Sequence, residues 1–453
     1  MRLANATLGA LSGEVRRADY DCAAQAVGLV HLGIGAFHRA HQAWYLDRAM
    51  EAGERDWAVL GVSLRSATVA DQLNPQDGLF TVTERSAAGE ATRLVGSVRK
   101  VLVASRDSQA VIAALAAPAT RIASLTVTEK GYCRAADGSL DMGLAGPGSI
   151  YPLLGEGLRR RHDAGLPGLT LLSCDNLAEN GRQLDVLMQQ WLEGHDPALA
   201  GWFRAECACP STMVDRIVPA TTEADRQALA ARIGLADHGA VVTEPFSQWV
   251  IEDRFAAGRP RLEAVGAELV GDVRPYETAK LRMLNAAHSL LAYAGLARGH
   301  CFVHQAIANP HLRALVGRLM LAEAAPTIAA PPGQDLAAYA RSLVARFANP
   351  ALNHRLAQIA MDGSQKIPQR WLETLAENRR MGRECPAIMA GLSAWLAHVQ
   401  GANGPLEDPL APQLAEVAGK AGGAALAGAL YGGTGPLGPG WQLSEAERAI
   451  LLR

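Results

Sequence analysis

The sequence contains no long hydrophobic run and no excess of charge of one sign. Its longest apolar stretches, 290–297 and 424–430, are far shorter than the roughly 20 residues that cross a bilayer. The 43 Lys and Arg residues are balanced by 45 Asp and Glu residues, for a net charge of −2. A general nucleic-acid-binding protein normally carries a basic excess. We therefore expect neither a membrane partner nor a nucleic-acid partner.

The sequence also lacks the signs of a secreted, disulfide-bonded protein. The N-terminal residues contain no apolar core followed by a small-residue cleavage site. The seven cysteines are an odd number scattered over 453 residues, which favours reduced thiols in a cytoplasmic protein. Cys207 and Cys209 form the only close pair, and no second pair or His-x3-His motif completes a zinc site. No metal is predicted.

Apolar residues are abundant enough for large cores, at 49% against 19% charged residues. In the first half, short apolar runs alternate with helix-compatible segments, which predicts parallel strands joined by helices and buried on both faces. These runs are 28–33, 57–62, 79–83, 122–128 and 169–173. After about residue 275, Ala/Leu-rich helical segments replace them. The sequence predicts an α/β Rossmann-like domain over 1–273 and a predominantly α-helical substrate and catalytic domain over 274–453, with no role assigned to the Gly-rich stretch 422–440.

A glycine-rich turn directly follows the first predicted strand. Gly33 and Gly35 stand where a strand-to-helix turn brings backbone N–H groups to a pyrophosphate. The third glycine of the usual dinucleotide motif would fall at His38, so a plain glycine-containing turn is an equally good interpretation. Arg39 would either bind the phosphates or be a solvated surface arginine.

The residues after the second predicted strand leave the choice between NAD and NADP open. An Asp or Glu at this position often binds an unphosphorylated ribose. The segment 63–68 contains no acidic residue, and the first one is Asp71. Arg65 would accept a 2′-phosphate or stack on the adenine.

Polar residues gather on one face of an otherwise apolar helical segment, 276–293. At about 100° per residue, Glu277, His288 and Asn285 lie about 60°, 80° and 140° from Lys280. Burying these groups together costs free energy unless they bind one another or a ligand. A reactive site, a structural polar network and an interdomain salt-bridge patch are the three interpretations.

As a reactive site, this face has a definite chemistry. Desolvation lowers the pKa of a lysine, so Lys280 would take the hydroxyl proton of an alcohol as hydride leaves the carbon. Asn285 would donate to the developing oxygen and His288 would orient a substrate hydroxyl. Glu277 would pass the proton to solvent. Asn176, after the predicted strand 169–173, is placed to be a second donor, or else is a helix N-cap or turn residue.

Together these residues resemble the mannitol dehydrogenase family, also called the polyol-specific long-chain dehydrogenases/reductases. The resemblance spans about residues 28–400 and rests on the spacing of Lys280, Asn285 and His288 in Lys-x4-Asn-x2-His. Supporting motifs lie at 33–42, 128–132, 173–180, 210–219, 244–253 and 362–370.

The resemblance implies a metal-independent dehydrogenase that uses NAD, with NADP as an open alternative. It implies that Lys280 is the general base and acid, that Asn176 and Asn285 are oxyanion donors, and that Glu277 gates the proton path. Asp215 and Lys366 match positions that border the substrate or support the site in relatives. The expected cofactor-binding residues are Gly33, Gly35, Ala36, Phe37, Arg39, Arg65, Thr128 and Glu129.

Two substrate classes remain within the family. Segments 128–132 and 358–370 are more similar to fructuronate reductases (D-mannonate oxidoreductases), which interconvert a keto acid and a hydroxy acid. Arg370 and Lys366 would then hold a carboxylate, unless Arg370 is a surface arginine at a helix start. Mannitol 2-dehydrogenases carry an arginine where this chain has Gln358, and this departure disfavours mannitol. A polyol such as mannitol, arabinitol or sorbitol is the alternative substrate.

Two other classes fit less well. A non-catalytic dinucleotide-binding regulatory protein predicts damage to the set Lys280, Asn285 and His288, which is intact. A zinc-dependent alcohol dehydrogenase needs Cys and His ligands at spacings that are missing. The expectation is a cytoplasmic enzyme, a monomer or a small homo-oligomer, that acts on a small sugar acid or polyol.

Overall fold

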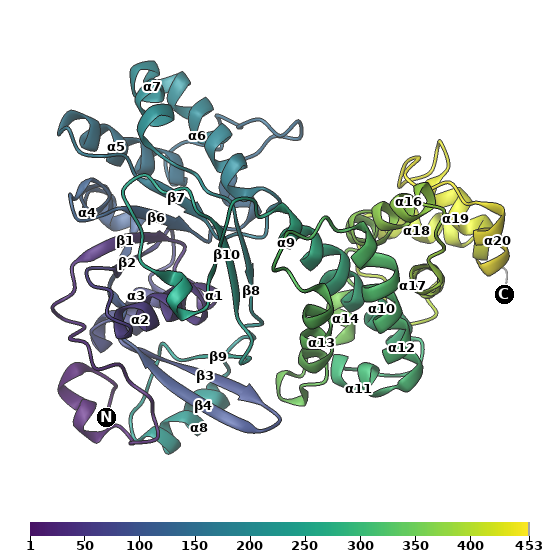
Figure 1. Ribbon diagram of the computed structural model, residues 1–453, viewed down its shortest axis with the longest axis horizontal. Helices are drawn as coiled ribbons and strands as arrows, with labels where there is room; N and C mark the ends of the chain where they lie inside the picture. Colours follow the sequence, from purple (N-terminus) through teal and green to yellow (C-terminus); the bar gives the residue numbers. More distant parts are fainter. Residues whose placement is uncertain (452–453) are drawn as a thin grey trace. The chain divides into compact units, whose positions relative to one another are not determined.

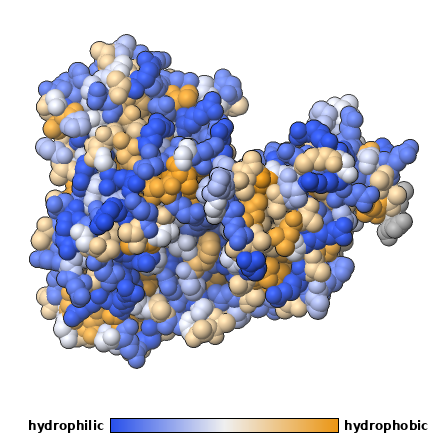
Figure 2. Space-filling model, in the orientation of Figure 1, coloured by the Kyte–Doolittle hydropathy of each residue, from blue (hydrophilic) through white to orange (hydrophobic). Residues whose placement is uncertain are grey.

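The structure is a computed structural model that describes residues 1–451, and the chain divides into two compact units. The first unit is Met1–Arg274 and the second begins at Pro275 (Figure 1). No helix within residues 1–451 is both long and apolar enough to span a membrane. On the face shown in Figure 2, hydrophilic residues cover most of the surface and hydrophobic residues form small groups between them.

The first unit is built on a five-stranded sheet in the order β5-β2-β1-β6-β7, in which every strand is parallel to its neighbours. The strands are β1 (Val27–Leu32), β2 (Ala58–Ser63), β5 (Val98–Val103), β6 (Ile122–Leu125) and β7 (Thr170–Ser173). The chain runs outward from β1 through β2 to β5 and then returns to β6 on the other side of β1. Ligands of open parallel sheets bind at the carboxyl ends of the strands where the order reverses in this way.

The strands are apolar throughout because both faces of this sheet are buried. Leu29 and Val59 pack on one face together with α2 (Gln42–Glu51). Val30 and Val62 pack on the opposite face, against helices that share their core. Those helices are α4 (Ala104–Ala116), α5 (Ile150–Asp163), α6 (Asn180–His195) and α7 (Pro197–Glu206). The predicted Rossmann-like class is confirmed.

One predicted strand lies outside the parallel sheet. Run 79–83 falls within β3 (Phe80–Ser86), which pairs antiparallel with β4 (Gly89–Val95) and parallel with β9 (Val241–Thr243). The hairpin explains the error, because a short apolar run looks the same in either pairing. The strand that pairs with β2 at this edge of the parallel sheet is β5 rather than β3. A third sheet contains β8 (Thr212–Asp215), β10 (Gln248–Glu252) and β11 (Glu268–Val270).

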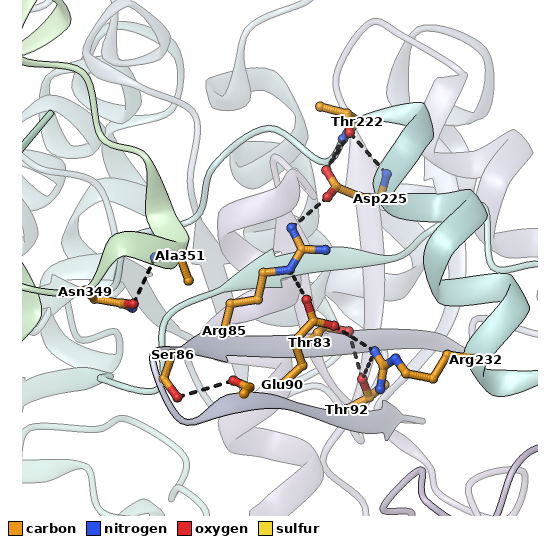
Figure 3. Close-up of polar contacts among 11 residues, drawn as sticks. Thr83, Arg85, Ser86, Glu90, Thr92, Thr222, Asp225, Arg232, Asn349 and Ala351 are labelled. Carbon is orange, nitrogen blue, oxygen red and sulfur yellow. Dashed lines mark hydrogen bonds and ion pairs between the residues drawn. The ribbon is translucent and has the colours of Figure 1, made fainter. Parts of the chain in front are cut away.

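Ion pairs join the β3–β4 hairpin to α8 (Glu223–Ile233). Arg85 lies 2.6 Å from both Glu90 and Asp225, and Arg232 lies 3.2 Å from Glu90 (Figure 3). The charges neutralise one another within the network, which fits a structural role. The first unit is completed by α1 (Ala36–Ala40), α3 (Thr68–Leu73) and the 3-10 helices η1 (Asn5–Ala10), η2 (Asn74–Gln76), η3 (Glu129–Tyr132) and η4 (Leu262–Val265).

The second unit is helical and packs around α10 (Ala286–Leu296), in which nine residues are buried. Three π-helical segments, η5 (Lys280–Asn285), η6 (Leu319–Ala324) and η9 (Pro368–Leu372), interrupt its α-helices. The Gly-rich stretch includes α19 (Gly423–Tyr431), which buries Leu426, Leu430 and Tyr431. The remaining helices are α9 (Arg274–Ala279), α11 (Val303–Ala308), α12 (Pro310–Arg318), η7 (Ala325–Thr327), α13 (Leu336–Phe347), η8 (Pro350–Leu352), α14 (Leu356–Ala360), α15 (Gly363–Ile367), α16 (Glu373–Arg380), α17 (Pro386–Val399), α18 (Ala411–Ala418) and α20 (Glu445–Leu451).

Candidate active site

The glycine-rich turn connects the carboxyl end of β1 to α1. Gly33 has φ +99°, and a Cβ atom there would lie 2.1 Å from the carbonyl oxygen of Thr126, so only glycine fits. Gly35 is the N-cap of α1, and the nearest atom to a Cβ there would be 3.8 Å away. Ala36 and Phe37 are the first two residues of the helix. The turn leaves room for a ligand beside Gly35.

The position of the missing third glycine is occupied by a histidine that packs inside the protein. The His38 ring stacks on His31 of β1 with 3.5 Å between ring centroids, and both side chains are fully buried. His31 Nδ1 and Nε2 lie 2.8 Å from Ser124 Oγ and 2.9 Å from Thr126 Oγ1. Burial lowers the pKa of His31 to about 3 and the pKa of His38 well below its usual value. Both rings are therefore neutral and support the turn from within.

Arg39 is buried, with a residual exposure of 6%. The alternative of a solvated surface arginine is wrong. Within residues 1–451, its Nε and Nη1 atoms have no hydrogen-bond partner. Burial lowers the pKa of Arg39 to about 10, and the nearby Asp237 carboxylate opposes that shift. A contact between Arg39 and cofactor phosphates remains a prediction.

Arg65 lies on the exposed loop that follows β2. Its charge is close enough to lower the pKa of Cys133, which burial and Asp141 raise overall. The neighbouring hydroxyls of Ser66 and Thr68 lie 2.8 Å apart. The loop therefore presents a cation and two hydroxyl groups where an acidic residue would favour an unphosphorylated ribose.

The loops after β6 and β7 place Thr128, Glu129 and Asn176 at the carboxyl edge of the sheet. The carboxylate of Asp175 accepts hydrogen bonds from the Val127 and Thr128 amides at 3.0 and 2.9 Å. Thr128 and Glu129 are exposed on one loop, and Asn176 is exposed on the other. The N-cap of α6 is Glu179, so the interpretation of Asn176 as a helix N-cap is wrong.

Asp215 is the last residue of β8 and is 6% exposed. The next residue, Arg216, is also buried, and its guanidinium connects this strand end to α1. Arg216 Nη1 donates to the carbonyl oxygen of Ala40 at 2.6 Å, and Nη2 lies 2.5 Å from Glu84 Oε1. Asp215 therefore sits on a strand end that is bonded to the end of α1.

In the second unit, Lys280 and Asn285 are the first and last residues of the π-helix η5. In an α-helix, residues five apart lie about 140° from each other around the axis. The i→i+5 hydrogen bonding of a π-helix instead brings such residues one turn apart on the same side. The helical arc estimated from the sequence is therefore wrong in detail, and the two side chains are closer in direction than a regular α-helix allows. Both residues are half-buried, as is Glu277 of α9.

His288 lies on α10, and its ring packs against two other aromatic rings. Its ring centroid lies 4.7 Å from that of Phe347 and 5.3 Å from that of His354. Burial, followed by the charges of His354, Arg346 and Arg370, lowers the pKa of His288 well below its usual value. Its Nε2 atom has no hydrogen-bond partner in the described part of the chain. A neutral imidazole with an unused nitrogen suits binding of a substrate hydroxyl.

Two neighbouring cations lie on α15 and η9, and one of them, Arg370, contacts this helix. Arg370 Nη1 donates to Ser289 Oγ at 2.8 Å and to the Asn285 carbonyl at 3.2 Å, so the interpretation as a surface arginine at a helix start is wrong. Lys366 Nζ donates to the Met361 carbonyl at 2.6 Å and lies 3.6 Å from Asp362. Burial lowers the pKa of Arg370 to about 10, and burial followed by the Arg370 charge lowers the pKa of Lys366.

Several supporting residues were not identified from the sequence. Ser289, His354 and Asp175 contact predicted site residues and were missed. Asp175 is adjacent to Asn176, and that adjacency was the only available signal. Among residues 1–451 no group of three or more His, Cys, Asp or Glu side chains could hold a metal ion.

Comparisons with known proteins agree along the length of the chain. The family described as the mannitol dehydrogenase Rossmann domain matches residues 27–264, and the mannitol dehydrogenase C-terminal domain matches 272–429. The chain is 41% identical to D-mannonate oxidoreductase of Escherichia coli K12 over 419 residues, which are 89% of this chain and 86% of that protein. It is 38% identical to mannitol 2-dehydrogenase of Aspergillus fumigatus over 420 residues, which are 87% and 84% of the two chains.

Solved structures give the same result. A D-sorbitol dehydrogenase in substrate-free form superposes with a TM-score of 0.92 at 33% identity, covering 100% of this chain and 97% of that one. The mannitol 2-dehydrogenase of Pseudomonas fluorescens, in a ternary complex with NAD and D-mannitol, superposes with a TM-score of 0.83 at 35% identity. That match covers 100% of this chain and 95% of the other.

Proposed function

The chain belongs to the mannitol dehydrogenase family and is a dehydrogenase acting on CH–OH donors, and we propose that its substrate is a sugar acid of the D-mannonate/D-fructuronate type. The proposed reaction interconverts a secondary alcohol and a ketone. The 41% identity to a D-mannonate oxidoreductase supports this choice. A polyol is the second candidate, because the mannitol 2-dehydrogenase of Aspergillus fumigatus is 38% identical.

The observation that carries the proposal is the pair of neighbouring cations Arg370 and Lys366, of which Arg370 bonds the Asn285 carbonyl. Within residues 1–451, the hydrogen bonds of the Arg370 guanidinium are made by Nη1 alone, to Ser289 and to the Asn285 carbonyl. The other edge of the guanidinium has the geometry to bind a carboxylate through two N–H groups. Lys366 adds a second positive charge close to Arg370. A sugar acid supplies a carboxylate that can pair with these partly desolvated cations, and a neutral polyol does not.

The proposed chemistry follows from the polar groups of η5 and α10. Lys280 takes the proton of the substrate hydroxyl during oxidation and returns it during reduction. Asn285, and Asn176 from the first unit, donate N–H groups to the substrate oxygen as it gains negative charge. His288 is neutral and orients a neighbouring hydroxyl, and Glu277 exchanges the proton with solvent. Asp215 is proposed to border the substrate.

The chain binds NAD, and the turn after β1 has the features that this cofactor requires. Gly33 adopts the positive φ of a tight turn, and the space beside Gly35 admits a close approach to the backbone. When bound, NAD would accept the hydride during alcohol oxidation, and NADH would supply it during ketone reduction. We propose that Ala36, Phe37 and Arg39 lie on the phosphate side of the cofactor. Arg65 would stack on the adenine or accept a 2′-phosphate, and Thr128 and Glu129 would contact the cofactor at the carboxyl edge of β6. The loop at Arg65 also leaves room for NADP as an alternative.

The proposal further places the enzyme in the cytoplasm, because all seven cysteines are free and four of them are buried thiols.

A substrate panel tests the function. Fructuronate, tagaturonate, fructose and mannitol are each assayed with NAD(H) and NADP(H) at 340 nm. We expect kcat/KM to be at least tenfold higher for a keto acid than for fructose. Higher kcat/KM for fructose or mannitol would assign the polyol reaction instead.

A further inference from the structure

One residue in the first unit has a backbone conformation that its side chain disfavours. Thr128 has φ +64° and ψ 166°, a region of the Ramachandran map that is occupied almost only by glycine. A β-branched residue is especially restricted there. Such a conformation persists only where the surrounding contacts compensate for its cost. The contacts of this segment therefore show what holds it.

The compensating contacts come from the neighbouring strand end. The Asp175 carboxylate accepts the amides of Val127 and Thr128 on its two oxygens, at 3.0 and 2.9 Å. It also accepts the Tyr132 hydroxyl at 2.8 Å, and that hydroxyl lies 2.5 Å from Ser173 Oγ. Asp175 is 9% exposed and Tyr132 is fully buried. A single buried carboxylate thus fixes the peptide group that leads into Thr128 and the peptide group before it.

Asp175 itself belongs to the segment after β7, and hydrogen bonds hold its backbone in place there. Asp175 lies two residues after the end of β7, and its carbonyl oxygen accepts a hydrogen bond from Asn180 Nδ2 at 2.9 Å. Asn180 is fully buried and also bonds the backbone of Thr212 in β8. Asn176, the next residue after Asp175, projects from this anchored position and is exposed. The carboxylate therefore joins the segment of Thr128 and Glu129 to the segment of Asn176.

We propose that Asp175 is a positioning residue that holds the Thr128–Glu129 segment and Asn176 in one fixed arrangement at the carboxyl edge of the sheet. The inference rests on the proposed function, which gives those exposed residues their roles toward the cofactor and the substrate oxygen. In this proposal, Asp175 itself contacts neither the cofactor nor the substrate. Its carboxylate acts by imposing a conformation on Thr128 that presents this segment to the cofactor.

The test is a double-mutant cycle read by NADH fluorescence titration and by kcat and KM. In Asp175→Asn, one of the two carboxylate oxygens that accept the backbone amides is replaced by an NH₂ group, so two donors face each other. We therefore expect NADH to bind about tenfold more weakly and kcat to fall. Adding Thr128→Gly to this variant should restore at least threefold of the NADH affinity, because glycine adopts the required conformation without the carboxylate. A merely structural role would not be rescued by a glycine at residue 128.

The chain offers a matched control. Asp47 is a buried carboxylate that accepts the Tyr20 hydroxyl at 2.7 Å and the Gly96 amide at 2.9 Å, at the amino end of β5. Asp47→Asn should lower Tm but leave NADH affinity within about twofold of the wild type. Unchanged NADH affinity in Asp175→Asn, no recovery in Asp175→Asn/Thr128→Gly, or an equal loss in Asp47→Asn would overturn the proposal.

Two features keep the test decisive. If Asp175→Asn does not fold, Tyr132→Phe takes its place, since it removes one donor to the same carboxylate. It should weaken NADH binding a few-fold, Thr128→Gly should reverse that loss, and wild-type affinity in Tyr132→Phe would overturn the inference. NADH titration needs no sugar, so a wild-type enzyme that is inactive on sugar acids would refute the proposed substrate without affecting this result.

Discussion

Replacing Arg370 separates a sugar-acid enzyme from a polyol enzyme, because only the former uses the charge of the guanidinium on its substrate. Burial lowers the pKa of Arg370 only to about 10, so the side chain is charged at neutral pH. A hydrogen bond to a charged group contributes about 1.5–3 kcal/mol, which corresponds to roughly 10- to 150-fold in kcat/KM. We expect Arg370→Ala to lower kcat/KM for fructuronate by that factor.

Arg370 also bonds residues of η5 and α10, and this second role must be removed from the comparison. Its Nη1 atom bonds the Asn285 carbonyl and Ser289 Oγ, so Arg370→Ala disturbs η5 whatever the substrate. The measured quantity is therefore the ratio of kcat/KM for fructuronate to kcat/KM for fructose, in which a shared disturbance cancels. We expect this ratio to fall by at least about tenfold, mainly through KM for the acid.

Two further variants bracket the result. Ser289→Ala removes the 2.8 Å bond to Nη1 and keeps the guanidinium, so the ratio should change by less than about threefold. Arg370→Lys keeps the charge and loses the two-pronged geometry, so its ratio should be intermediate. Equal losses for fructuronate and fructose in Arg370→Ala would refute the assignment of a carboxylate to this residue.

Three other predictions concern the turn, pH and metals. Gly33→Ala should lower the free energy of unfolding by more than about 1 kcal/mol, because its Cβ would lie 2.1 Å from the Thr126 carbonyl oxygen. Gly35→Ala is the control, since no atom lies within 3.4 Å of a Cβ there. Equal unfolding midpoints of the two variants in urea would contradict the reasoning. The pKa of buried His38 is lowered, so the unfolded state binds the extra proton and stability falls as the pH drops below the unfolded pKa of about 6.5. Between pH 7.5 and 5.5 the wild type should lose about 1.4 kcal/mol more than His38→Phe in urea titrations, and parallel losses would show that His38 is charged in the fold. Activity should survive dialysis against EDTA, whereas a loss restored by Zn²⁺ would reject the lysine mechanism.

The parts of the fold that follow from periodicity were predictable from the sequence. Runs 28–33 and 169–173 are strands because an uninterrupted apolar run between turn residues has few alternatives when both sheet faces are covered. Run 79–83 was placed in the wrong sheet, since its partner β4 is set by a hairpin further along the chain. Pairing is a tertiary property that a single run does not encode.

The candidate site residues were predicted by type and spacing, but their geometry depends on backbone features that periodicity does not reveal. The π-helix that begins at Lys280 breaks the 3.6-residue repeat from which their directions were estimated. His38 stands where a glycine was expected because a buried stack with His31 fills that space. Asp175 was missed because its partners, the amides of Val127 and Thr128, lie about fifty residues away in the sequence.

The central claim is that Lys280 transfers the proton, and its replacement tests this most directly. In Lys280→Ala, kcat for the best substrate of the panel and the dissociation constant of NADH are measured side by side. We predict that kcat falls by about 10²- to 10⁴-fold while NADH affinity stays within about threefold of the wild type. A variant that keeps its turnover rate, or one that loses NADH binding along with activity, would contradict the account.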